Sequence, residues 1–99
     1  MKRKEKVSVS AQQKYEYAKM MVEDGYSTRQ IQDISGASSS AVQRWRKQYL
    51  DEKSGQTPAS HKAITPEQQR IQELEKQLAR AKRDIDILKK ASALFIQNS

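Results

Sequence analysis

The chain has 99 residues, of which 35% are hydrophobic and 31% charged, and it contains no cysteine. A chain this short and polar can build one modest core, so a catalytic core would have to be very compact or completed by another chain. The missing cysteines exclude disulfides and thiolate metal sites, while the net charge of +7 favours an anionic partner such as nucleic acid.

Residues 1–9 are predicted to form a basic arm. Four of its residues are cationic: Lys2, Arg3, Lys4 and Lys6. These cations suit DNA phosphates, where charge matters more than exact position. No apolar run follows them, so we expect neither a signal peptide nor a membrane partner, and a cytoplasmic protein.

Residues 10–50 are predicted to form three short helices. Ser10 with Gln13 and Ser27 with Gln30 read as capping boxes that start the first and second helices. Gly25 and Gly36 can adopt the left-handed conformation that ends each of them. Ser38 then caps the third helix. The residues expected to face inward are Tyr15, Tyr17, Ala18, Met21 and Val22 in the first helix, Ile31 and Ile34 in the second, and Ala41, Val42, Trp45 and Tyr49 in the third.

This order of short helix, glycine turn, serine cap and third helix is that of a helix-turn-helix. Val42 and Trp45 would anchor the third helix, leaving its polar face free to enter the major groove of DNA. The base-reading candidates are Ser39, Ser40, Gln43 and Arg44, since Gln can pair with adenine and Arg with guanine. The phosphate-binding candidates, besides the arm, are Arg29, Ser38, Arg46 and Lys47. The alternative is a three-helix packing unit whose cations are merely solvated.

Residues 51–64 are rich in Ser, Gly, Pro and Thr with no apolar period, which predicts a flexible or weakly ordered linker. The single histidine, His61, lies in this stretch without companion ligands, so we expect a solvated loop residue and no metal. We place the boundary between two domains here.

Residues 65–99 are predicted to form one long helix with a leucine-zipper pattern. Thr65 as N-cap, Pro66, Glu67 and Gln68 mark its start. Heptad a and d positions are filled by Ile71, Leu74, Leu78, Ala81, Ile85, Leu88, Ser92 and Phe95.

The charges beside these heptads favour a parallel homodimer. Such a pairing brings Arg70 near Glu75 and Asp84 near Lys89 of the other helix. The a and d residues form the contact seam between the two helices, and the small side chains of Ala81 and Ser92 contribute little packing to it. Three apolar residues lie off it and leave the oligomeric state open, namely Ile87, Leu94 and Ile96. The alternative is one amphipathic helix that folds back on its own N-terminal domain.

The sequence therefore predicts an all-α protein with an N-terminal three-helix DNA-binding domain, a linker and a coiled-coil helix. The acids are scattered along amphipathic surfaces, and with one histidine and no cysteine we expect no catalysis by this chain alone and no cofactor. Three functions are consistent with this pattern: a transposition-associated DNA-binding subunit, a stand-alone transcriptional repressor, and a coiled-coil adaptor that binds no nucleic acid.

The chain resembles the first-frame (OrfA-type) protein of two-frame bacterial insertion-sequence transposases. The likeness spans nearly the whole chain, from the basic start to the C-terminal helix. The segments that carry it are Gly25-Tyr26-Ser27, Ser38 to Trp45, Arg46-Lys47-Gln48-Tyr49 and Ile87-Leu88-Lys89-Lys90-Ala91. Two positions depart from the family's pattern and bear on how the second helix sits: Gln32 replaces a small residue and Ser35 an apolar one.

The resemblance implies binding to the element's terminal inverted repeats, multimerisation through the zipper, and control of transposition by the frame-fused full transposase. It places this action at the bacterial nucleoid. It also implies association with a full-length frame-fused transposase, whose downstream domain carries three metal-binding carboxylates. In that family a slippage of the reading frame near the zipper's end joins the two parts. Lys89-Lys90 is a dipeptide that an A-rich slippery run would encode.

Overall fold

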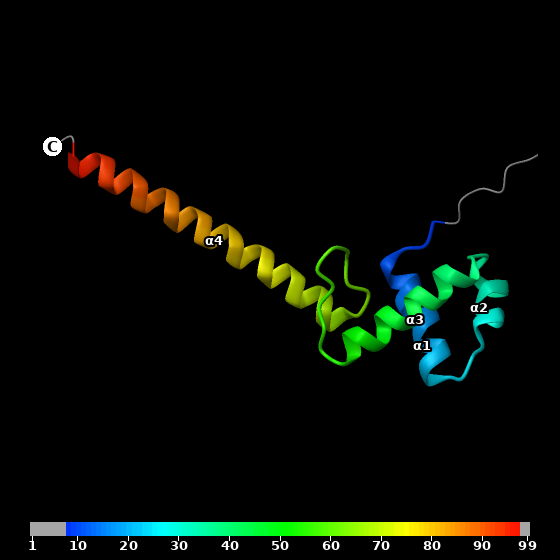
Figure 1. The fold of residues 1–99 in the computed structure, drawn as a ribbon. Helices are drawn as coiled ribbons and strands as arrows, with labels where there is room; N and C mark the ends of the chain where they lie inside the picture. Colours follow the sequence, from blue (N-terminus) through cyan, green and yellow to red (C-terminus); the bar gives the residue numbers. More distant parts are fainter. Residues whose placement is uncertain (1–7, 98–99) are drawn as a thin grey trace, which may run out of the picture.

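A computed structural model describes residues 8–97, which form a small helical bundle followed by one long helix (Figure 1). The helices are α1 (Ala11–Glu23), α2 (Thr28–Ser35), α3 (Ser39–Lys53) and α4 (Pro66–Gln97). No strand occurs in this described part of the chain, so the all-α prediction is confirmed. The predicted phosphate contacts Lys2, Arg3, Lys4 and Lys6 lie outside the described residues.

Both predicted capping boxes form. The Ser10 hydroxyl accepts from the Gln13 amide while the Gln13 side chain accepts from the Ser10 amide, and Ser27 and Gln30 exchange the same pair of bonds. Each box supplies acceptors for amides that have no partner inside the helix. The starts of α1 and α2 are therefore fixed by local sequence.

The bundle core lies where the three short helices meet. It consists of Ala18, Met21, Ile31, Val42, Trp45, Tyr49 and Ile64. The prediction for Ile34 is wrong, because its side chain is 53% exposed. Ile34 lies three residues after the fully buried Ile31, on a neighbouring part of the helix surface. The helix α2 has only about two turns, and Ile34 falls outside the area in which it contacts α1 and α3.

Tyr49 joins the core to α1 through its hydroxyl, which donates to Glu23 Oε1 at 3.0 Å. Burial raises the pKa of Tyr49 to about 12, and the bond to the Glu23 carboxylate and its negative charge act in the same direction. The folded state therefore holds the phenol proton more tightly than the unfolded chain, whose tyrosine pKa is about 10.

We expect this difference to make the fold sensitive to alkali. The stabilisation is complete below pH 10 and is lost as the pH rises from 10 toward 12, because the unfolded state releases the proton first. Thermal unfolding followed by circular dichroism should show a melting temperature that falls across this window. Tyr49→Phe should remove most of that fall, whereas Tyr26→Phe, at an exposed position, should keep it.

The expectation of a weakly ordered linker over residues 51–64 is wrong. α3 continues through Lys53, and the chain then folds back so that Ala63, Ile64 and Thr65 are buried. Glu52 is also buried and accepts hydrogen bonds from the amides of Ile64 and Thr65 and from the Thr65 hydroxyl. We call this hydrogen-bonded turn, residues 52–68, the junction.

The junction also replaces the expected capping exchange at the start of α4. The Thr65 hydroxyl donates to Glu52 Oε1 at 2.7 Å, and the Gln68 side chain accepts from the Thr57 hydroxyl and donates to the Glu52 carbonyl. A carboxylate at a helix N-terminus favourably opposes the positive end of the helix dipole. Glu52 therefore accepts from the Thr65 amide, the bond that a capping Gln68 side chain would otherwise make.

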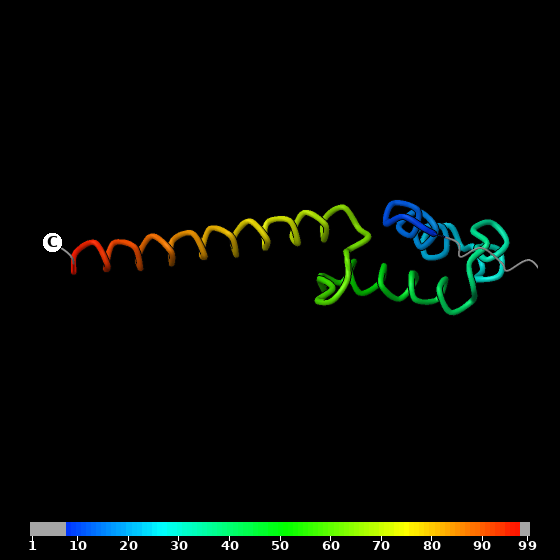
Figure 2. Tube along the Cα trace, turned by 90° about the horizontal axis from the view of Figure 1, so that it is seen from above, coloured from blue at the N-terminus to red at the C-terminus, as the bar shows by residue number. Residues whose placement is uncertain are grey.

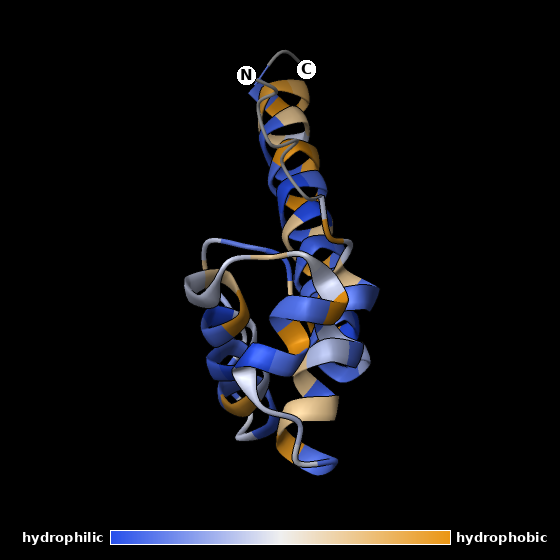
Figure 3. Cartoon of the chain, turned by 90° about the vertical axis from the view of Figure 1, so that its right-hand side faces the viewer, coloured by the Kyte–Doolittle hydropathy of each residue, from blue (hydrophilic) through white to orange (hydrophobic). Residues whose placement is uncertain are grey.

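Beyond the junction, α4 extends away from the bundle, which gives a molecule of 70 × 39 × 16 Å (Figure 2). Apolar and hydrophilic residues are interspersed along it (Figure 3). All eight predicted seam residues are exposed: Ile71, Leu74, Leu78, Ala81, Ile85, Leu88, Ser92 and Phe95. The alternative of a helix folded back on its own domain is wrong, and the seam is uncovered in the single chain.

Candidate nucleic-acid interface

The turn before α3 is built by three small residues. Gly36 ends α2 in the left-handed conformation with φ of 75°, and the Ser35 hydroxyl accepts from the Ala37 amide at 3.1 Å. Ser38 then caps α3 by accepting from the Ala41 amide. Ser35, which stands where the family's pattern has an apolar residue, thus has a local structural role. Its hydroxyl supplies a hydrogen-bond acceptor that an apolar residue lacks.

The inward face of α3 is fixed by Val42 and Trp45. Val42 is fully buried and Trp45 is 6% exposed. The Trp45 ring stacks on Tyr17 of α1, with ring centroids 5.8 Å apart and an angle of 18° between planes. This stacking turns the side of α3 that carries Trp45 toward α1. The predicted burial of Trp45 is confirmed.

The opposite face of α3 carries the four predicted base-reading residues, and all are exposed: Ser39, Ser40, Gln43 and Arg44. We call these four the reading face. The Gln43 amide nitrogen donates to the Ser39 hydroxyl at 3.4 Å, a long bond that leaves both groups available. Their roles at bases stay predictions.

The predicted phosphate contacts in the described chain lie on α2 and α3. Ser38 is the N-cap of α3, Arg46 and Lys47 follow along the same helix, and Arg29 lies in the first turn of α2. All four are exposed, and their roles at phosphates stay predictions.

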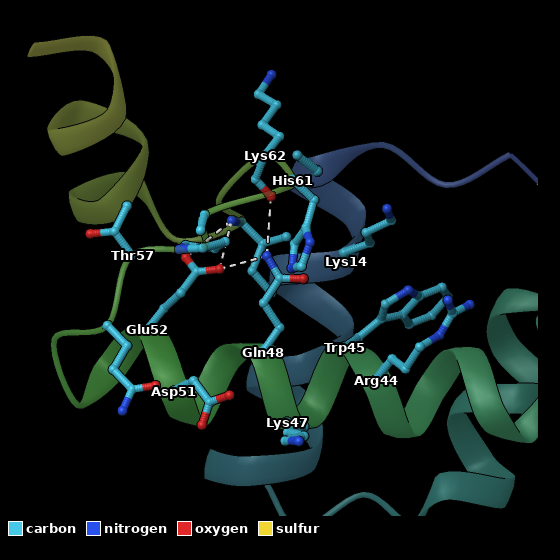
Figure 4. A pocket seen from close by; sticks show the side chains of 15 residues that line it. Lys14, Arg44, Trp45, Lys47, Gln48, Asp51, Glu52, Thr57, His61 and Lys62 are labelled. Atoms are coloured by element: carbon cyan, nitrogen blue, oxygen red, sulfur yellow. Dashed lines mark hydrogen bonds between the residues drawn. The ribbon is translucent and has the colours of Figure 1, made fainter. Parts of the chain in front are cut away.

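A groove of about 750 Å³ that the sequence did not indicate runs beside the C-terminal half of α3. Arg44, Lys47 and Asp51 line it from α3, and residues 56–59, 61 and 62 form its other wall (Figure 4). Two lysines that are not among the predicted phosphate contacts also line it, Lys14 of α1 and Lys62 of the junction. The sequence did not indicate them because residues 56–62 have no periodicity from which the direction of Lys62 follows, and because Lys14 of α1 lines a groove only once the junction has folded.

Other kinds of site are not seen in the described part. Among residues 8–97, no three His, Asp or Glu side chains lie together in a way that could hold a metal ion. In the same residues, no helix combines the length and apolarity that crossing a bilayer requires.

Comparisons with known proteins agree with this geometry. Residues 1–79 match the helix-turn-helix model of the family described as Transposase. Over 87 residues the chain is 39% identical to the transposase InsN for insertion sequence element IS911A of Escherichia coli (strain K12), covering 88% of this chain and 64% of that protein. It is 36% identical over 85 residues to InsN for element IS911B of the same strain, covering 86% of this chain and 96% of that protein.

The chain thus spans slightly less than two thirds of the first relative and nearly all of the second. No solved structure matches it significantly.

Proposed function

Because the chain belongs to this helix-turn-helix transposase family, we propose that it is the DNA-binding subunit of an insertion-sequence transposase and recognises the terminal inverted repeats of its element. The observation that carries the proposal is the reading face. Its four polar side chains are exposed on one side of α3 while Trp45 is locked on the other. This is the arrangement in which a recognition helix presents side chains to base edges.

The reading face has the chemistry to discriminate bases. The Arg44 guanidinium can donate two hydrogen bonds to guanine, and the Gln43 amide can donate and accept at adenine. Ser39 and Ser40 are small, so the first turn of α3 can approach the floor of the major groove closely. Arg46 and Lys47 further along α3 supply charge for phosphates, which adds affinity without sequence choice.

The long helix α4 supports multimerisation in this proposal. Its uncovered seam joins two copies in parallel, with Arg70 beside Glu75 and Asp84 beside Lys89 of the other copy. The same seam accommodates one copy of the full-length, frame-fused transposase, which carries the catalytic carboxylates. The subunit itself acts by positioning DNA at the bacterial nucleoid.

Arg44→Ala tests the base-reading role. We expect binding to the inverted repeat to weaken by about 1–3 kcal/mol because a bidentate contact to a base is lost. Binding to random DNA should change little. The measurement is a fluorescence-anisotropy titration with both DNAs at one salt concentration, and Arg46→Ala on the same helix is the matched control, expected to weaken both DNAs alike.

Equal losses on both DNAs with Arg44→Ala would contradict the reading role. A footprint of the unaltered protein that is absent from the ends of the element would contradict the proposed target.

A further inference from the structure

The groove beside α3 continues the reading face. Ser40, Arg44, Lys47 and Asp51 are spaced by four, three and four residues, so they share one stripe of the helix. The last three of them line the groove. When DNA contacts α3 at Ser40, the same stripe of the helix therefore extends from that contact to the groove of the protein.

The part of this stripe from Ser40 to Lys47 is nearly as long as the DNA major groove is wide. From Ser40 to Lys47 the helix rises about 10 Å at 1.5 Å per residue, and the major groove is about 12 Å wide. When Ser40 and Arg44 lie at base edges, Lys47 and the mouth of the groove beyond it come beside the phosphates that border the major groove.

The second wall of the groove is held in place rather than free. The Gln48 side chain of α3 donates to the Lys62 carbonyl at 3.1 Å, and the Gln72 side chain of α4 donates to the carbonyls of Pro58 and His61, both at 3.0 Å. Figure 4 shows the Lys62 side chain extending outward from this wall. The wall is thus a pre-ordered element, which lowers the entropy cost of a contact there.

The charge of the groove favours an anion. Four cationic side chains line it: Lys14, Arg44, Lys47 and Lys62. Of the two acids, Glu52 is buried and engaged with the backbone of Ile64 and Thr65. Asp51 alone presents an opposing carboxylate. The excess positive charge therefore lies beside Lys47, where docking of Ser40 and Arg44 at base edges brings the phosphates that border the major groove.

We propose that this groove binds the phosphate backbone of duplex DNA, with Lys14 and Lys62 as phosphate contacts on either side of it. The proposal rests on the proposed function and extends the interface beyond the helix-turn-helix to the junction. These contacts carry no sequence information, so they raise affinity for every DNA equally.

Salt dependence of binding tests the proposal. Lys14→Gln and Lys62→Gln remove charge and keep a polar side chain, and circular dichroism verifies that each variant folds. Each lost phosphate contact should lower the slope of log affinity against log salt by about 0.9, which corresponds to about eightfold weaker binding at 0.1 M salt. The double variant should show twice the change in slope, on inverted-repeat and random DNA alike.

Lys76→Gln on exposed α4 is the matched control and should leave the slope unchanged. Asp51→Asn should tighten binding because it removes the one opposing charge. Unchanged slopes in the Lys14 and Lys62 variants, or an equal change with Lys76→Gln, would overturn the groove contacts. Arg44→Ala reports independently on the proposed function, because a loss of discrimination between the two DNAs with this variant supports the reading role whether or not the lysine variants change the slope.

Discussion

Replacing Glu52 by alanine is expected to open the junction between α3 and α4, at a cost of about 3 kcal/mol or more. The carboxylate is 3% exposed and accepts from two backbone amides and the Thr65 hydroxyl. Each buried donor left without an acceptor costs about 1–3 kcal/mol. The loss falls on the amides of Ile64 and Thr65, which donate to this carboxylate.

Amide hydrogen exchange measures this effect locally. Protection at Ile64 and Thr65 should fall by more than about a hundredfold, since each 1.4 kcal/mol corresponds to a factor of ten. Glu67→Ala is the matched control: it also removes an acid from the start of α4, but at an exposed position, and should cost at most about 1 kcal/mol through the helix dipole. Undiminished protection in the Glu52 variant would show that these bonds do not hold the junction.

Leu78→Pro is the second change expected to have a large effect, because it should abolish self-association through α4. Proline in a helix interior costs about 3 kcal/mol by removing a backbone hydrogen bond and clashing with the preceding turn. In a symmetric pair the cost falls on both helices. Multi-angle light scattering should then report the mass of one chain, 11.4 kDa, whereas we expect the unaltered protein to give twice that value.

A second substitution separates loss of the seam from loss of the helix. Leu78→Asp keeps α4 helical yet places a charge in the seam, and it should also give single chains. Arg80→Asp introduces the same residue two positions further, off the seam, and should leave the pair intact. Pairs that persist with both Leu78 variants would place the interface elsewhere.

Local sequence determines most of the bundle, and those parts could be predicted. The capping boxes at Ser10 and Ser27, the left-handed Gly36 and the Ser38 cap each depend on residues within four positions of one another. The burial of Trp45 follows from a three- and four-residue apolar period that α3 maintains over several turns. The residues of the reading face are then the positions of α3 that lie opposite this apolar period.

The junction could not be predicted because its bonds join distant residues of polar character. Glu52 meets Ile64 and Thr65 twelve and thirteen residues along the chain, and Gln48 meets Lys62 across fourteen. A stretch of Ser, Gly, Pro and Thr carries no hydrophobic period, so composition alone indicated a free linker. Lys14 and Lys62 were missed for the same reason, since the groove between them exists only once the junction has folded.

The 32-residue length of α4 sets a reach. At 1.5 Å per residue it spans about 48 Å, the axial length of roughly 14 base pairs of B-form DNA. A partner bound at the C-terminal end of α4 is therefore separated from the start of this helix by more than the length of one full turn of duplex DNA, and the start of the helix is joined to α3 by the hydrogen bonds of Glu52 to Ile64 and Thr65.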